Sequence, residues 1–313
     1  MKAVRMHRKG GPELLQYEDA PVPGVEAGDA LVRVFASSIT KTELTWDETY
    51  RDSAGRPRTP STIGHEFSGV VEGVAPGVTI VRPGEAVYGL CSFNRNGSAA
   101  EYLAVRADGL APKPATLDHV AAASVPLAAL TAWQTFFDKA PLQKGQRVLI
   151  HGGAGGVGIF AVQLANWIGA RVIATGSARN HDFLGELGAH EVVDYNTTRF
   201  EDAVQDADVV LDTVGGETLD RSWSVLKRGG MLVSIVQPVD AEKAKAAGVR
   251  GLFFIVEPNR TQLMEIGKLI DSGRMRTHVD KVFPLGEARR AIEYGLRGHA
   301  RGKIVLRVAE VTG

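Results

Sequence analysis

Residues 147–165, RVLIHGGAGGVGIFAVQLA, carry the strongest structural signal in the chain. The apolar run 148–150 predicts a buried strand, and the glycines after it fit the spacing GxGxxG at Gly153, Gly155 and Gly158. Apolar residues then recur with the spacing of a helix. A strand, a glycine turn and a helix in this order are typical of a site that binds a dinucleotide.

Each glycine of this turn has a physical role in that prediction. The first allows a tight turn, the second lets a pyrophosphate approach the backbone, and the third lets helix and strand pack closely. The start of the helix presents N–H groups and a positive dipole end to the phosphates. The alternative is a glycine-rich turn that serves packing alone. The predicted cofactor-binding residues here are Gly153, Ala154, Gly155, Gly156, Val157 and Gly158.

The segments on either side of this stretch differ in character. Before about residue 112, short strands rich in Val, Leu and aromatic residues alternate with Gly/Pro turns, which predicts antiparallel β-structure. Asp118 is a plausible cap for a helix over 119–137 that Pro126 should interrupt. Strands and helices then alternate up to residue 256, which predicts an α/β fold with a doubly wound parallel sheet. The segment from residue 261 is too short for a core of its own, so we expect it to pack on the N-terminal β-structure.

Composition limits the classes of function. Lys+Arg and Asp+Glu both number 36, so the formal net charge is zero, which argues against nucleic acid or an anionic membrane as the main partner. No apolar run is long enough to span a membrane. The single cysteine, Cys91, excludes a disulfide framework and a thiolate-rich zinc site. We expect a cytoplasmic protein.

The end of the second predicted strand indicates which dinucleotide is bound. Sites that prefer NAD carry an Asp or Glu there, for the ribose 2′-hydroxyl. Here the strand ends at Gly176 and no acid follows; Ser177 and Arg179 stand in its place. Because an arginine makes charge-assisted hydrogen bonds to a phosphate, this arrangement favours NADPH. The alternative is that Arg179 is an ordinary solvated charge at the start of a helix.

Taken together, these stretches resemble the medium-chain dehydrogenase/reductases, and within them the zinc-independent quinone oxidoreductase branch. The resemblance covers nearly the whole chain. It implies a Rossmann cofactor domain over 119–260, and a GroES-like, β-rich catalytic domain formed by 1–118 and 261–313. The matching stretches are IGHEFSGVVEGVAPGV (63–78), VPLAALTAWQTF (125–136), HGGAGGVGIFAVQLA (151–165), LGAHEVVDY (187–195), DTVGG (212–216) and RGKIVL (301–306).

The resemblance also implies further cofactor contacts. Thr131 should approach the nicotinamide end and Tyr195 the 2′-phosphate, while Val214 should border the nicotinamide. The end of a later strand, Phe253, Phe254 and Ile255, should do the same. The alternative is that Val214 and these strand-end residues are simply core. Relatives are commonly dimers that pair through the cofactor domain, so a homodimer is expected.

Zinc-dependent members of this superfamily hold a catalytic zinc with an early Cys, the His of a GHE motif and a later Cys. In this chain the segment 37–44, SSITKTEL, has no cysteine, so only His65 and Glu66 remain. We therefore predict that no zinc is bound, and that His65 and Glu66 organise hydrogen bonds between the two domains. A site made of these two residues and one more carboxylate stays conceivable.

Without a Lewis acid, reduction of a quinone, or of a C=C bond conjugated to a carbonyl, is easier than alcohol chemistry. Relatives place an Asn and then a Tyr in the segment that here has Thr40 and Thr45–Trp46. Tyr50 stands near the place where enoyl reductases keep a proton-donating tyrosine. We hypothesise that Tyr50 or Thr40 hydrogen-bonds the substrate oxygen, and that Thr45 and Trp46 line the pocket. The alternatives are a half-exposed loop tyrosine and a tryptophan that packs between domains.

Three functions follow. The leading one is an NADPH-dependent oxidoreductase that passes a hydride to a quinone-like acceptor without a metal. Its rival within the same class is a 2-alkenal or enoyl reductase. The alternative of another class is an NADPH-binding sensor or structural protein with little turnover.

Overall fold

The computed structural model describes residues 1–298 and 300–310, and the chain divides into two compact units. The first consists of Met1–Leu127, Glu257–Gly273 and Thr277–Gly313. The second consists of Ala128–Val256 with Arg274–Arg276. The predicted changes of domain, after residues 118 and 260, lie close to the observed changes after residues 127 and 256.

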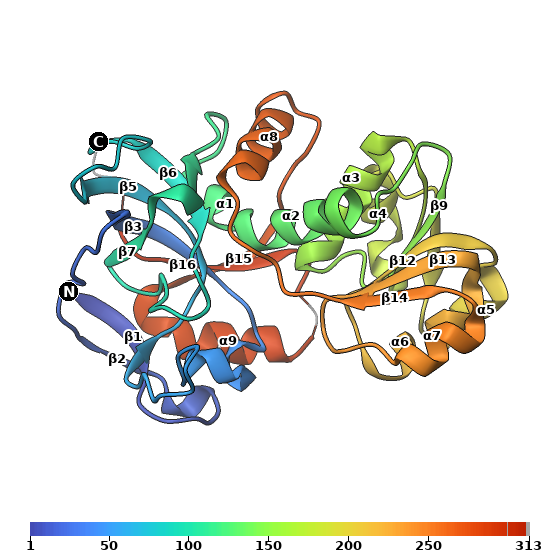
Figure 1. The fold of residues 1–313 in the computed structure, drawn as a ribbon, viewed down its shortest axis with the longest axis horizontal. Helices are drawn as coiled ribbons and strands as arrows, with labels where there is room; N and C mark the ends of the chain where they lie inside the picture. Colours follow the sequence, from blue (N-terminus) through green and yellow to red (C-terminus); the bar gives the residue numbers. More distant parts are fainter. Residues whose placement is uncertain (299, 311–313) are drawn as a thin grey trace. The chain divides into compact units, whose positions relative to one another are not determined.

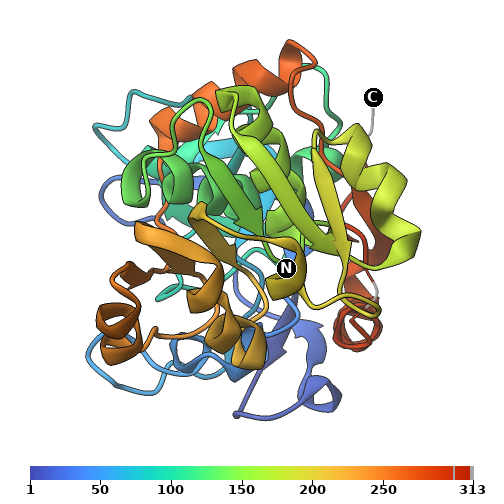
Figure 2. The same cartoon turned by 90° about the vertical axis from the view of Figure 1, so that its right-hand side faces the viewer.

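The second unit is built on a six-stranded parallel sheet with the order β11-β10-β9-β12-β13-β14. This is the doubly wound sheet that the sequence predicts, and its strand order reverses between β9 and β12 (Figures 1 and 2). Ligands of such sheets bind beyond the carboxyl ends of the strands at that reversal. The strands are β9 (Arg147–Ile150), β10 (Arg171–Gly176), β11 (Glu191–Asp194), β12 (Ala207–Asp212), β13 (Leu226–Ser234) and β14 (Arg250–Phe253).

Helices follow the strands and cover the sheet because each turns an apolar side toward it. The core of this unit joins Leu149 of β9, Ile173 of β10, Val210 of β12 and Leu232 of β13, all fully buried. The predicted strand end at Phe253, Phe254 and Ile255 was placed too late, since β14 ends at Phe253. The helices are α3 (Gly156–Ile168), α4 (His181–Glu186), α5 (Phe200–Ala203), α6 (Gly216–Ser222) and α7 (Ala241–Ala247).

The first unit holds two sheets of mainly antiparallel strands. The larger has seven strands in the order β15-β16-β3-β5-β6-β8, with β7 paired to β3, and the smaller has the order β2-β1-β4. The strands are β1 (Lys2–Met6), β2 (Gln16–Asp19), β3 (Asp29–Ile39), β4 (Ser61–Thr62), β5 (Glu66–Val74), β6 (Ala86–Leu90), β7 (Tyr102–Arg106), β8 (Leu110–Pro112), β15 (Val279–Pro284) and β16 (Lys303–Arg307).

The C-terminal segment joins this β-structure, as the sequence predicts. β16 pairs antiparallel with β3, so that Ile304 lies opposite Ile39. The helix α9 (Ala288–Leu296) buries Ala291 and Ile292 in the same core as Val4 and Leu306. The helix α8 (Arg260–Asp271) is held to β6 by Tyr88, whose hydroxyl donates to the Leu263 carbonyl at 2.6 Å.

The helical segment after residue 118 is interrupted as expected. Asp118 caps α1 (His119–Ala123) by accepting a hydrogen bond from the Ala121 N–H at 2.7 Å. A new helix, α2 (Pro126–Trp133), begins at the proline, where a missing N–H costs nothing. A π-helical turn, Gln134–Lys139, ends the segment. Within the described part of the chain, no helix combines the length and apolarity needed to cross a membrane.

Candidate active site

The glycine turn after β9 forms a cradle at the start of α3, but its tightest point lies one residue earlier than predicted. Gly152, not Gly153, has the left-handed conformation, with φ of 67°. Gly153 is required by packing instead, because a Cβ there would lie 2.9 Å from the Ala174 Cβ. A Cβ on Gly158 would lie 2.2 Å from the Gly152 carbonyl oxygen, so the third glycine does allow the close approach of helix and turn.

The N-terminus of α3 fits a pyrophosphate. Gly155 is the N-cap and offers no side chain to the first N–H groups of the helix, which have no partners within the helix either. A Cβ at Gly155 would meet only the Gly152 carbonyl oxygen, at 3.2 Å. Gly155, Gly156 and Val157 are partly exposed, and Ala154 beside them is 7 % exposed. Backbone donors thus reach the surface at the positive end of a 13-residue helix.

The residues predicted for the 2′-phosphate lie at the carboxyl ends of adjacent strands. Gly176, the last residue of β10, pairs with Asp194, the last residue of β11, so that Ser177 and Tyr195 follow at the same edge of the sheet. Arg179 is exposed, and Tyr195 is 61 % exposed. The Asn180 amide donates to the Ser177 hydroxyl at 3.3 Å, which orients that serine.

One acid does stand at this edge, at a position that the sequence analysis did not consider. Asp194 ends β11, one strand further out than the usual ribose-binding acid. Its carboxylate accepts hydrogen bonds from the backbone N–H and the side-chain amide of Asn196, both at 2.9 Å. The Asn196 backbone N–H is the main cause of the lowered pKa of Asp194. The Asp194 carboxylate thus stabilises the turn that follows β11.

The loop after β12 is held by a buried carboxylate that the sequence analysis also missed. Asp212 is fully buried and accepts from the N–H groups of Val214 and Gly215 at 3.0 and 2.9 Å. Its other oxygen accepts from the Ser234 hydroxyl at 2.9 Å. A signal was available in the motif DTVGG, where an acid ends a buried strand next to two glycines.

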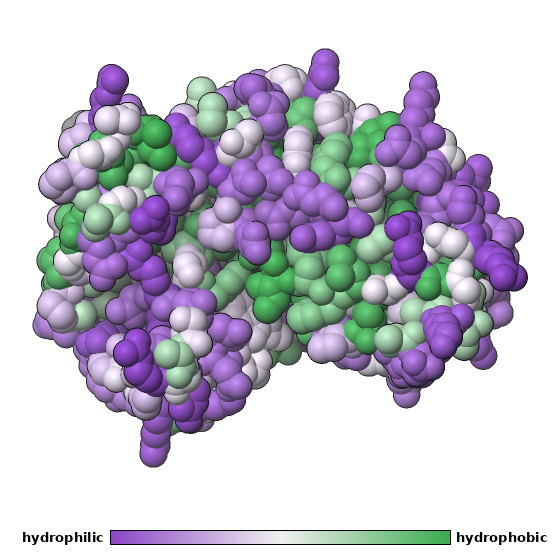
Figure 3. Space-filling view, viewed as in Figure 1, coloured by the Kyte–Doolittle hydropathy of each residue, from purple (hydrophilic) through white to green (hydrophobic). Residues whose placement is uncertain are grey.

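This loop and the two strand ends beside it present apolar side chains to solvent. Val214, Val236 and Ile255, which follow β12, β13 and β14, are 52 %, 47 % and 56 % exposed. In Figure 3, hydrophobic side chains gather along β14 and the segment that continues from it. Core packing, the alternative for these positions, therefore applies to Phe254 at 9 % exposed, but not to Val214 or Ile255. Phe253 is half-buried.

Thr131 lies in α2 and is buried, with 3 % of its surface exposed. Its carbonyl oxygen accepts a hydrogen bond from the Thr135 hydroxyl at 2.7 Å. This contact belongs to the helix itself. A contact of Thr131 with the nicotinamide stays a prediction.

In the first unit, the segment after β3 brings an aromatic cluster together. The Trp46 ring stacks on His65, with ring centroids 6.0 Å apart, and meets Phe93 edge-on at 5.5 Å. Trp46 and Phe93 are half-buried, whereas His65 is 4 % exposed. We call Trp46, His65 and Phe93 the aromatic cluster. Phe93 is a further candidate pocket residue that the sequence analysis did not single out.

The other predicted pocket residues lie near this cluster in the chain. Thr40 is half-exposed directly after β3, and Thr45 is exposed. The Thr45 hydroxyl donates to the Thr42 carbonyl at 2.7 Å and so stabilises the turn. Of the two, Thr40 has the more enclosed position.

Tyr50 lies in the core of the first unit, not on a half-exposed loop. It is 7 % exposed and packs with Leu44 and Ile63. Its hydroxyl donates to the Leu44 carbonyl at 2.8 Å, and burial raises its pKa. This geometry gives the hydroxyl a structural partner, and proton donation by Tyr50 stays a prediction.

His65 forms a buried ion pair at the centre of the first unit. Its Nε2 lies 3.2 Å from Glu43 Oε1, and the two side chains are 3 % and 1 % exposed. The same carboxylate oxygen accepts from the Gly64 N–H at 2.6 Å, and Cys91 Sγ lies 3.7 Å from His65 Nδ1. Burial acts to lower the pKa of His65, but the Glu43 carboxylate and the Cys91 thiol together raise it to about 10.

These residues do not fit a zinc ion. Cys91 and Glu43 approach opposite nitrogens of the imidazole, so their donor atoms do not converge on one point. Among the described residues, no group of three or more His, Cys, Asp and Glu side chains could hold a metal. Glu66 is also engaged, because its carboxylate pairs with Lys303 Nζ at 2.5 Å and accepts from the Leu127 N–H at 2.9 Å.

The partners of His65 and Glu66 bear on the expectation that these residues organise hydrogen bonds between the two domains. Glu43, Cys91 and Lys303 belong to the first unit, as do His65 and Glu66, so these contacts stabilise that unit from within. Leu127 is the last residue of the first unit and lies within the predicted cofactor domain, 119–260, so its hydrogen bond to Glu66 joins the two domains as predicted.

The His65–Glu43 pair predicts how stability depends on pH. The pKa of His65 is raised from 6.5, its value in an unfolded chain, to about 10. Its contribution to the free energy of unfolding is therefore fully present below about pH 6.5, and is lost as the pH rises toward 10, at up to roughly 1.4 kcal/mol per pH unit. Urea unfolding between pH 7 and 9.5 should show this loss. A Glu43→Gln variant that keeps the same slope would contradict the assignment.

Two family models match the chain. One, the alcohol dehydrogenase GroES-like domain, matches residues 26–115 in the first unit. The other, zinc-binding dehydrogenase, matches residues 187–306. A β-rich GroES-like unit together with a doubly wound dinucleotide-binding unit defines an oxidoreductase of the dehydrogenase class.

Individual proteins agree with this class. The probable zinc-binding oxidoreductase, mitochondrial, of Arthroderma benhamiae is 34 % identical over 94 % of this chain and 92 % of its own. The chloroplastic NADPH-dependent alkenal/one oxidoreductase of Arabidopsis thaliana is 30 % identical over 98 % of this chain and 79 % of its own. The structure of the quinone oxidoreductase from Coxiella burnetii superposes with a TM-score of 0.91 at 33 % identity, covering 99 % of each chain. The chain belongs to the medium-chain dehydrogenase/reductase superfamily, as the resemblance of its motifs indicates.

Proposed function

We propose that the chain reduces a quinone-like electrophilic acceptor with NADPH, without a metal ion. The observation that carries this proposal is the pairing of an uncapped α3 N-terminus with Ser177 and Arg179, in place of an acid, at the end of β10. The names of relatives support it, since one is a quinone oxidoreductase and another an NADPH-dependent alkenal/one oxidoreductase. The absence of zinc is supported by donor atoms around His65 that do not converge.

The residues of the chain would act on cofactor and acceptor by binding and orientation. The loop 153–158 would hold the pyrophosphate on backbone N–H groups, and Ser177, Arg179 and Tyr195 would bind the 2′-phosphate. Val214, with Phe253–Ile255, would border the nicotinamide, as would Thr131. When bound, the reduced nicotinamide supplies the hydride.

On the acceptor side, the aromatic cluster would position a flat molecule. The half-buried Trp46 ring offers a planar surface for stacking, and the His65–Glu43 pair fixes the imidazole beneath it. Thr40 is the candidate donor to the oxygen of the acceptor, with Thr45 at the pocket rim. A planar electrophile needs orientation and exclusion of water more than acid catalysis. This favours a quinone over an alkenal, whose carbon must also be protonated.

Two alternatives stay open. A 2-alkenal or enoyl reductase would share the fold and cofactor, and one relative carries that activity in its name. That activity would give Tyr50 a role that its present hydrogen bond to Leu44 does not favour. An NADPH-binding sensor with little turnover would use the cofactor unit alone.

We also propose a homodimer formed through the cofactor unit. β14 is the last strand of its sheet, and Leu252 and Phe253 on it are only half-buried, so one edge is open to a second copy. The molecular mass of the protein in solution would test this assembly: twice the mass of one chain is expected, and the mass of one chain would contradict the dimer. We also propose a cytoplasmic location. One relative is named as mitochondrial and another as chloroplastic, so cell fractionation is the experiment that tests the location.

The experiment that tests the function is a set of initial rates. NADPH and NADH oxidation would be followed with a planar naphthoquinone and with a medium-chain 2-alkenal, before and after treatment with chelator. We expect quinone turnover that prefers NADPH and does not respond to the chelator. Turnover of the alkenal alone, lost in Tyr50→Phe, would support the enoyl-type alternative. NADPH binding without any turnover would support the sensor.

An Arg179→Gln arm of the same experiment tests the cofactor assignment. Loss of a charge-assisted contact to the 2′-phosphate should raise KM for NADPH by about tenfold and leave KM for NADH nearly unchanged. Arg171→Gln is the matched control, because Arg171 is the first residue of β10, at the opposite end of the strand from Arg179, and pairs with Glu191 at the surface. An equal rise for both cofactors would place Arg179 outside the phosphate site.

A further inference from the structure

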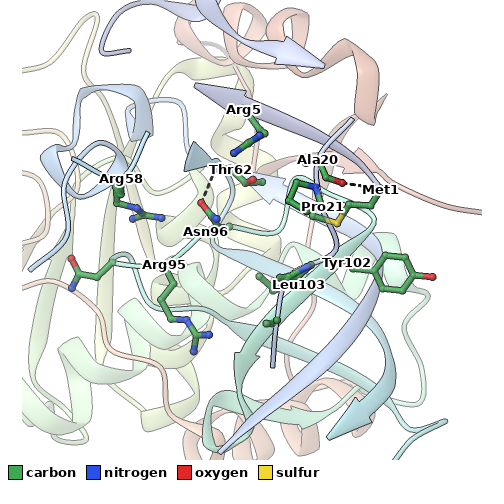
Figure 4. A pocket seen from close by; sticks show the side chains of 15 residues that line it. Met1, Arg5, Ala20, Pro21, Arg58, Thr62, Arg95, Asn96, Tyr102 and Leu103 are labelled. Atoms are coloured by element: carbon green, nitrogen blue, oxygen red, sulfur yellow. Dashed lines mark hydrogen bonds between the residues drawn. The ribbon is translucent and has the colours of Figure 1, made fainter. Parts of the chain in front are cut away.

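The first unit contains a cavity of about 330 Å³ that the oxidoreductase function does not use. Its walls come from the strand β1, the turn after β2, the short strand β4, the loop after β6 and the strand β7 (Figure 4). None of the predicted cofactor or acceptor residues lines it. The lining residues include Arg5, Arg58, Arg95, Thr62, Asn96 and Leu103.

The charged groups of this lining are all positive. The described lining residues include three arginines and no aspartate or glutamate. Arg95 is neutralised by Asp29, which accepts two hydrogen bonds from its guanidinium at 2.9 and 2.6 Å. Arg5 pairs with Glu18 at 3.2 Å, and Glu18 also accepts from His7. Two of the three arginines therefore have carboxylate partners outside the cavity, and the Met1 ammonium donates to the Ala20 carbonyl at 2.9 Å.

Arg58 is different, because its guanidinium is bound to neutral groups. Its Nη1 donates to the carbonyl oxygens of Glu48 and Phe93. The carboxylates that act on it through space are already engaged, since Glu43 pairs with His65 and Asp52 with Arg56. Among the three arginines, Arg58 is thus the one without a carboxylate partner of its own in the described structure.

Arg5 lies at the same wall, but its donors are not open to the cavity. Its Nη2 donates to the Pro60 carbonyl at 2.9 Å, and its Nε is buried and has no hydrogen-bond partner in the described structure. In Figure 4 the guanidinium groups of Arg5 and Arg58 point toward Asn96 and Thr62, while that of Arg95 points away. The Asn96 carbonyl oxygen accepts from the Thr62 N–H at 3.1 Å, so its amide is directed by that contact. Arg58 is therefore the arginine of this wall that a ligand would engage, and Arg5 adds positive charge beside it.

We propose that this cavity binds a small organic monoanion, with its carboxylate on Arg58 and an apolar body against Pro21 and Leu103. A guanidinium group matches the planar, bidentate geometry of a carboxylate. The volume lies at the small end of the range for ligand pockets, which limits the body to the size of one ring.

The test uses the full chain saturated with NADPH, so that the cofactor site is closed to the probe. Benzoate is the probe, its neutral isostere benzamide and inorganic phosphate are the comparisons, and binding is followed by calorimetry or by ligand-observed NMR. We expect benzoate to bind at least about tenfold more tightly than benzamide or phosphate. Failure of benzoate to bind, or equal binding of benzamide, would overturn the proposal, and phosphate binding without benzoate binding would overturn the organic ligand.

Variants locate the probe. Asn96→Asp keeps the acceptor for the Thr62 N–H and adds a negative charge to the wall, so it should weaken benzoate binding by about tenfold or more without loss of folding. Arg58→Gln should do the same. Arg56→Gln is the matched control, because Arg56 is exposed, pairs with Asp52 and does not line the cavity. Benzoate binding that is indifferent to Asn96→Asp would place the probe elsewhere.

Discussion

Gly158→Ala is expected to weaken NADPH binding by at least about a hundredfold and to lower the free energy of unfolding by roughly 2–3 kcal/mol. The added Cβ would lie 2.2 Å from the Gly152 carbonyl oxygen and 2.6 Å from that of Gly153. Both are backbone atoms, so the turn itself must move. The N–H groups that face the pyrophosphate would then lose their position at the start of α3.

Fluorescence titration with NADPH and urea unfolding would measure the two effects. Gly185→Ala is the matched control: Gly185 lies in α4, is exposed, and has no heavy atom within 4 Å of an added Cβ. That variant should bind NADPH as the parent does and gain up to about 1 kcal/mol of stability from helix propensity. If Gly158→Ala bound NADPH with unchanged affinity, the cradle would not be the phosphate site.

Lys303→Met is expected to lower the free energy of unfolding by about 3–5 kcal/mol, because it leaves the Glu66 carboxylate buried without its cation. Glu66 and Lys303 have side chains that are 1 % and 7 % exposed, and Nζ lies 2.5 Å from Oε1. The pair links β5 to the C-terminal strand β16 across β3. Its loss should therefore loosen the attachment of the C-terminal segment.

Urea unfolding of three variants would separate this cause from a general effect of losing a lysine. Lys268→Met removes a surface ion pair between Lys268 and Glu265, whose side chains are 67 % and 46 % exposed respectively. It should lower the free energy of unfolding by no more than about 0.5 kcal/mol. The double variant Lys303→Met with Glu66→Gln should recover part of the stability, since no charge is then left unpaired. A loss in Lys303→Met no larger than that in Lys268→Met would count against the buried pair.

The two buried pairs, His65–Glu43 and Glu66–Lys303, also explain the structural role of the GHEF motif at residues 64–67. His65 is fixed by Glu43 and Cys91, and Glu66 by Lys303 and the Leu127 N–H. Each side chain already has its partners, so the motif supports the aromatic cluster and the sheet. In the proposed reaction this leaves orientation of the acceptor, and not polarisation by a metal, as the contribution of this unit.

Much of the molecule was predictable from local patterns. The strand and the helix on either side of the glycine turn, the alternation of strands and helices, the break at Pro126 and the return of the C-terminal segment were confirmed. These features depend on periodicity and turn chemistry, which neighbouring residues determine. The family resemblance rests on the same local motifs.

Other features depend on residues that are distant in the chain. The glycine with positive φ is Gly152, because the turn is shaped by its fit against β10 and β12. Tyr50 is in the core because Leu44 and the C-terminal segment cover it, and Lys303 meets Glu66 only when β16 joins β3. Hydropathy within a short window carries no information on such partners.

The sequence by itself therefore determined the class of fold, the dinucleotide turn and the absence of an acid after β10, because each is written in consecutive residues. Only the tertiary structure decided that His65 pairs with Glu43, that Asp212 holds the loop that contains Val214, and that three arginines line a separate cavity. The physical reason is that charges and hydrogen bonds act over a few ångströms in space, and strands far apart in the chain bring these groups within that range.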